Sequence, residues 1–118
     1  MPATFSPTII DGVIRRHIGF DGVLISDDIS MGALQGSLAE RTRRALAAGC
    51  DLALHCNGVL AEMEEVADAA APLTAAAQAR LARAEALRRR SMQPFDRAAA
   101  EARFSQLLSR EKAAAPSA

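Results

Sequence analysis

The feature that most constrains the fold is the presence of only two candidates for buried β-strands. Residues 22–26 form a short, continuous, β-branched run, and residues 51–55 form the second candidate. Such runs are typical of parallel strands that are covered on both faces. Two parallel strands alone leave both outer edges unpaired. We therefore expect further strands to come from another chain, or this chain to be a piece of something longer.

Helices are expected around both strands. The capping box Ser37-x-x-Glu40 opens one helix and Gly49 closes it, while Asn57 or the next glycine is expected to cap another. The order helix–strand–helix–strand–helix implies a right-handed parallel crossover between the strands, and hence an α/β fold. The helices predicted by caps and by apolar spacing are residues 7–18, 37–48, 58–71 and 72–90, and a last one that follows Asp96.

The length and the charge of the chain limit the folds and the partners that it can have. A chain of 118 residues is too short for a complete (β/α)8 barrel, which needs roughly 250. The 14 basic and 14 acidic residues balance, so we expect neither a nucleic-acid partner nor a membrane partner. Cys50 and Cys56 are expected to be small buried residues in a reducing compartment. No signal peptide or membrane span is visible, which predicts a cytoplasmic protein.

Polar side chains follow both predicted strands. Asp27 and Asp28 come directly after the first, where α/β enzymes place their chemistry. Because neighbours on an extended chain point to opposite faces, one carboxylate is expected in a site and the other in its support. The alternative is that one of them caps the following turn. His55 and Asn57 end the second strand, where they either line a pocket or bind a loop and cap the next helix.

Residues 19–31, Gly-Phe-Asp-Gly-Val-Leu-Ile-Ser-Asp-Asp-Ile-Ser-Met, resemble the nucleophile segment of glycoside hydrolase family 3. The segment resembles the form that is found in bacterial β-N-acetylhexosaminidases of peptidoglycan recycling. The resemblance extends over most of residues 2–110. Three other stretches agree with it: residues 2–7 with the lead-in to the helix before that strand, residues 47–57 with the last barrel strand, and residues 94–96 with the C-terminal appendage of the shorter members.

The resemblance implies a partial TIM-like (β/α)8 barrel, of which this chain supplies the last two parallel strands with flanking helices, plus C-terminal helices. Residues 2–71 would be the C-terminal part of the barrel, residues 72–112 the helical appendage and residues 113–118 a disordered tail.

The resemblance also implies retaining hydrolysis without a metal or cofactor, with Asp27 as the nucleophile. Asp28, Met31, His55 and Asn57 would support the nucleophile or line the pocket. The implied substrate is terminal β-linked N-acetylglucosamine on a peptidoglycan fragment, cleaved in the cytoplasm.

Several family motifs are missing from the sequence. The acid/base of these enzymes is an aspartate–histidine pair in an Asp-Ser-His-like context, and no Asp-x-His occurs here. The sugar-binding Lys-His and Pro-Gly-His-Gly segments are also absent. We therefore expect a C-terminal fragment that carries the nucleophile but not the acid/base and is inactive alone, with the missing barrel segment as its partner.

Two alternatives from other classes remain. One is a non-enzymatic remnant or pairing module of the same ancestry. The other is a receiver-like phosphoacceptor domain, since a strand that ends in Asp-Asp also resembles its acidic pair. That fold needs five strands and a lysine late in the sheet, whereas this sequence offers two strand candidates and Lys112 in a helical tail.

Overall fold

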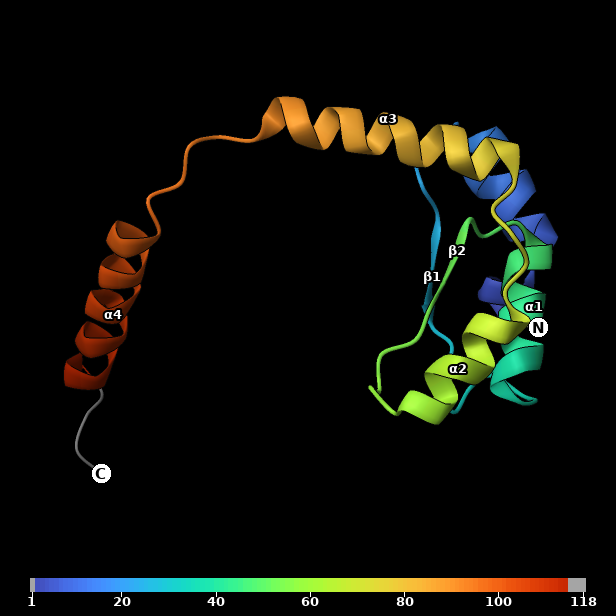
Figure 1. Cartoon of the computed structure of the whole chain (residues 1–118), viewed down its shortest axis with the longest axis horizontal. Coiled ribbons are helices and arrows are strands. Elements are labelled where there is room, and N and C mark those ends of the chain that lie inside the picture. Colours follow the sequence, from blue (N-terminus) through green and yellow to red (C-terminus); the bar gives the residue numbers. More distant parts are fainter. Residues whose placement is uncertain (1, 115–118) are drawn as a thin grey trace. The chain divides into compact units, whose positions relative to one another are not determined.

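A computed structural model describes residues 2–114 and divides the chain into two units, one up to Arg88 and one from Arg89 onward. None of the helices in this described part has the length and apolar character needed to cross a membrane. In the first unit the elements are η1 (Ala3–Phe5), η2 (Thr8–His17), β1 (Ile25–Asp28), α1 (Leu38–Ala48), β2 (Leu52–Leu54), α2 (Leu60–Ala69) and most of α3 (Ala75–Ser91); the second unit contains α4 (Arg97–Ala114) (Figure 1).

The two predicted strands form a parallel pair, with Ile25 opposite Leu52 and Asp28 opposite Leu54. At the carboxyl end, the Ile29 N–H donates to the Leu54 carbonyl at 2.8 Å. The predicted α/β class and the parallel crossover are therefore confirmed. The barrel and its domain boundaries remain predictions.

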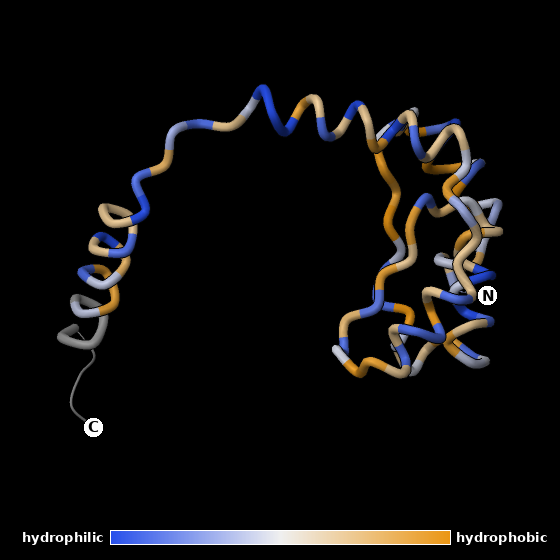
Figure 2. Tube along the Cα trace, in the orientation of Figure 1, coloured by the Kyte–Doolittle hydropathy of each residue, from blue (hydrophilic) through white to orange (hydrophobic). Residues whose placement is uncertain are grey.

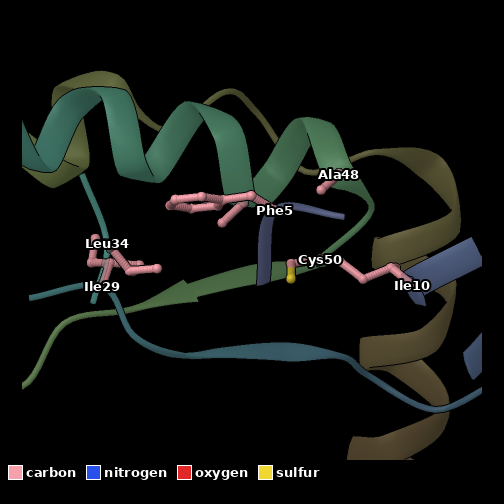
Figure 3. Packing of buried hydrophobic residues seen from close by; sticks show 7 residues of the cluster. Phe5, Ile10, Ile29, Leu34, Ala48 and Cys50 are labelled. Carbon is pink, nitrogen blue, oxygen red and sulfur yellow. The ribbon is translucent and has the colours of Figure 1, made fainter. Parts of the chain in front are cut away.

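A small hydrophobic core covers one face of this pair (Figure 3). It joins η1, η2 and α1 to the turn that follows β1. Burial raises the pKa of the core thiol, Cys50. Cys56, by contrast, is exposed beyond the end of β2, so the expectation that both cysteines are buried was wrong. The buried members of the core are Phe5, Ile10, Ile29, Leu34, Ala45, Ala48 and Cys50.

The first strand differs from its prediction in position and burial. It was expected at residues 22–26 with both faces covered, but β1 starts at Ile25 and includes both aspartates. Ile25 is 51% exposed and Ser26 only 6%, because the core packs on one face alone. The strand is longer at its polar end because pairing with β2 continues past the apolar run. Figure 2 shows hydrophobic residues leading into β1 and hydrophilic ones at its end.

The caps of α1 form as predicted. The Ser37 Oγ accepts the Glu40 N–H at 3.2 Å, and the Ser37 N–H donates to the Glu40 carboxylate at 2.8 Å. Gly49 ends the helix with φ +114°, and a Cβ there would lie 2.9 Å from Cγ2 of Ile10. A side chain at this position would therefore be strained and would collide with the core.

Three helices differ from the prediction in detail. The first, η2, is a π-helix, in which the Ile18 N–H reaches back five residues to Val13. Asn57 does not cap α2, which starts after Val59; its Oδ1 instead accepts the Val59 N–H in the preceding turn. The last helix, α4, runs to Ala114 and so includes residues 113–114 of the expected tail. Residues 115–118 lie outside the described residues.

Asp51 links four segments at the amino end of the sheet. Its side chain is 4% exposed. One carboxylate oxygen accepts from Arg15 at 2.8 Å and from the Leu24 N–H at 2.9 Å, and the other accepts from Arg80 at 2.9 Å. Burial acts to raise the pKa of Asp51, but the Leu24 hydrogen bond and the two guanidinium groups outweigh it and lower that pKa. The sequence analysis identified Asp51 only as the start of a strand.

We expect Asp51→Ala to lower the free energy of unfolding by about 3–5 kcal/mol, since breaking a buried ion pair leaves its partners uncompensated. Because the pKa of Asp51 is lowered on folding, its contribution is present above the unfolded-state pKa of about 4 and is lost as the pH falls below it. Urea unfolding at pH 7 and pH 3 measures both effects. Asp11→Ala is the matched control, because Asp11 pairs with Arg16 on the exposed surface. A change below 0.5 kcal/mol for Asp51→Ala at pH 7, no larger than that of the exposed control, would contradict this role.

Candidate active site

Asp27 lies on the open face at the carboxyl end of β1. Its side chain is exposed, and its Oδ1 accepts the N–H of Asp28 at 2.8 Å. The residue also borders a cavity of about 180 Å³ between β1 and η2, together with Ile14 and Leu24. The Asp27 side chain is thus accessible to a small molecule, and it forms no ion pair with another described residue.

Ser26 fixes the backbone immediately before Asp27. Its buried hydroxyl donates to the Asp27 carbonyl at 2.7 Å and accepts the Leu54 N–H at 2.9 Å. One side chain therefore ties β1 to β2 at the position of the exposed carboxylate, so that the direction of Asp27 is set by the pairing of the strands.

Asp28 has a different environment from its neighbour. Its carboxylate accepts the Ser30 N–H at 2.9 Å and the Ser30 hydroxyl at 2.6 Å. These two hydrogen bonds lower the pKa of Asp28, nearby His55 lowers it further, and burial opposes them. The two aspartates therefore occupy different surroundings, as the alternation along the strand predicted. The bonds to Ser30 also form the turn that the sequence analysis gave as the alternative role for one of the aspartates.

Arg41 of α1 holds the loop that follows β1. Its guanidinium donates to the carbonyl of Ile29 at 3.0 Å, to that of Met31 at 3.3 Å and to that of Gly36 at 2.9 Å. Met31 therefore takes part in the turn through its backbone. Arg41 was missed by the sequence analysis, because nothing in its local spacing distinguishes it from the other arginines of the helix.

His55 directly follows β2, and its ring lies between Asp28 of β1 and Glu62 of α2. Its side chain is 5% exposed, with Nδ1 3.9 Å from Asp28 Oδ1 and Nε2 3.4 Å from Glu62 Oε2. Neither ring nitrogen makes a hydrogen bond within the described structure. Asn57 donates from its Nδ2 to the same Glu62 carboxylate. Glu62 was also missed, although an acidic residue in the first turn of a helix was visible in the sequence.

The structure thus separates the predicted site residues into two groups. His55 lies between Asp28 and Glu62, and Asn57 binds Glu62, whereas the Asp27 side chain lies on the open face and meets this group only through the backbone N–H of Asp28. A nucleophile or a ligand-binding carboxylate at Asp27 is compatible with this arrangement. His55, Glu62 and Asn57 are placed to support the turn at the end of β1 from the side of β2 and α2. The catalytic roles themselves remain predictions.

Comparisons with known proteins agree on one family. Residues 1–90 match the family model described as "Glycosyl hydrolase family 3 N terminal domain". A "Beta-hexosaminidase" of Thiobacillus denitrificans is 44% identical over 84 residues, which are 70% of this chain and 23% of that protein. One of Methylobacillus flagellatus is 40% identical over 84 residues, again 70% of this chain and 24% of that protein. One of Psychromonas ingrahamii is 48% identical over 58 residues, 48% of this chain and 17% of that protein. The chain therefore spans less than a quarter of the length of these relatives.

Proposed function

Since the chain belongs to glycosyl hydrolase family 3 through the N-terminal domain of that family, we propose that residues 2–71 form the closing strands of that domain in a retaining β-N-acetylhexosaminidase. In this proposal β1 and β2 are the last two strands of a TIM-like barrel, residues 72–112 are its C-terminal appendage, and Asp27 is the nucleophile. The acid/base comes from a part of the barrel that these residues do not provide.

The observation that carries the proposal is the position of Asp27. It is exposed at the carboxyl end of a parallel strand, on the face that the core leaves open. Active sites of (β/α)8 barrels lie at that end of the strands. The exposed Ile25 and Leu54 support the same orientation, because inward-facing apolar side chains fill the interior of such barrels.

The reaction would follow the retaining course. Asp27 attacks the anomeric carbon while an acid protonates the departing oxygen, and the glycosyl–aspartate ester that forms is then hydrolysed by water. Asp28 stays bound to Ser30 and keeps the turn in place. We propose terminal β-linked N-acetylglucosamine of peptidoglycan fragments as the substrate and the cytoplasm as the compartment. The family match favours this hypothesis over the receiver-like one.

A chimera tests the proposal. The matched 84 residues of the Thiobacillus denitrificans relative are replaced by the corresponding residues of this chain, and hydrolysis of an aryl β-N-acetylglucosaminide is measured. We expect turnover within about 10²-fold of the parent enzyme, the cost of small displacements at the reacting groups. A matched chimera with Asp27→Ala controls for residual activity. A folded chimera without turnover would refute the proposal.

A further inference from the structure

His55 is a buried polar side chain whose hydrogen-bonding needs are not met among the described residues. It is buried, and both of its ring nitrogens lack a hydrogen bond within the described residues. Buried polar atoms are nearly always partnered, so an exception calls for a reason. The groups that face the ring are two carboxylates, Asp28 at the end of β1 and Glu62 in the first turn of α2.

The ring faces two hydrogen-bond acceptors. A neutral ring has one N–H and one acceptor nitrogen, so it can donate to only one of the two carboxylates. A protonated ring has two N–H groups and can donate to both. At 3.9 Å and 3.4 Å the two nitrogens are slightly too far for good hydrogen bonds but within range of electrostatic attraction. Asn57 binds Glu62 from the other side, which holds that carboxylate toward the ring.

A chain of contacts leads from His55 to Asp27. The imidazole faces Asp28 Oδ1, the Asp28 carboxylate binds Ser30, and the backbone N–H of Asp28 donates to Asp27 Oδ1 at 2.8 Å. We propose that His55 is a positioning residue: it holds Asp28 from the β2 side and thereby fixes the orientation of the Asp27 carboxylate. The contact is independent of any activity, while its catalytic meaning rests on the proposed function.

Nuclear magnetic resonance of the full chain with ¹³C- and ¹⁵N-labelled aspartate tests the contact. Magic-angle spinning makes the measurement independent of any self-association of the open sheet. The Asp28 carboxyl carbon is followed between pH 2 and 6, the range that spans the titration of an ordinary aspartate. Replacing His55 by leucine removes the imidazole and is expected to raise the pKa of Asp28, since His55 lowers it.

Three further variants calibrate the change in the pKa of Asp28. Ser30→Ala should raise the pKa of Asp28 more than His55→Leu does, because it removes the hydroxyl hydrogen bond from Ser30, the largest cause of the lowering. His17→Leu is the matched control: His17 is exposed at the end of η2 and should leave Asp28 unchanged. His55→Gln keeps a polar side chain of similar reach without the imidazole, and replaces the leucine variant if that one fails to fold.

The second readout is the amide proton of Asp28 at neutral pH, which reports on its bond to Asp27. We expect it to move upfield in His55→Leu and His55→Gln but not in His17→Leu. An unchanged Asp28 pKa in the His55 variants would overturn the contact, and an unchanged amide proton would overturn its effect on Asp27. Neither readout uses hydrolysis, so an inactive chimera with positive results here would refute the proposed function and leave the positioning contact standing.

Discussion

The purified 118-residue chain is expected to release no measurable product from an aryl β-N-acetylglucosaminide. An unassisted carboxylate leaves the departing oxygen unprotonated, and a general acid is typically worth about 10²–10⁴-fold. The sugar also lacks the binding groups that would hold it near Asp27, so the gain from proximity is lost as well. His55 is no substitute for the acid, because its ring is buried against Asp28 and Glu62.

The measurement is release of a chromogenic aryl group over a day at micromolar protein. The Asp27→Ala chain serves as the blank, since traces of a host enzyme would act equally in both samples. Turnover by the native chain that disappears in the Asp27→Ala chain would show that the acid is present within these residues, contrary to the expectation.

The second large effect concerns the two aspartates in the active chimera. Asp27→Ala is expected to reduce kcat by about 10⁶-fold, as removal of a nucleophile does in other enzymes with covalent intermediates. Asp28→Ala removes the partner of Ser30 and displaces the turn, which should cost only about 10²-fold. The ratio of the two losses distinguishes the nucleophile from its support.

Covalent labelling gives an independent reading of the same assignment. A slow fluorinated glycosyl donor should form an ester with the nucleophile, and peptide mass spectrometry of the labelled chimera should place it on Asp27. Label on Asp28 would reverse the two roles. Pretreatment with an excess of the unfluorinated substrate should protect the enzyme if the label enters through the same site.

Local features of the sequence predicted the local features of the fold. The capping box at Ser37 and Glu40 and the left-handed glycine at position 49 form as expected, because each depends on residues close together in the chain. The parallel crossover also followed from the order of the elements. The end of β1 was misplaced because strand length depends on pairing with β2, where Asp28 lies opposite Leu54, 26 residues away.

The site was predicted in part for the same reason. Asp27 and Asp28 were placed by their position after an apolar run and by the alternation of an extended chain. Arg41 and Glu62 were missed, since each meets the site only through the packing of a helix against the strand ends. The burial of His55 also depends on that packing. Sequence spacing identifies residues on one element, whereas a support built from three elements becomes visible only in the fold.

The network around Asp51 has a consequence for protein engineering. It joins Arg15, Leu24 and Arg80 at the amino ends of the strands, whereas Asp27, Asp28 and His55 lie at the carboxyl ends. Because substitutions without shared partners usually add independently, substitutions in the loops at residues 30–33 and 56–59 are expected to leave this anchor unchanged. The short strands thus separate the candidate site at their carboxyl ends from the charged anchor at their amino ends.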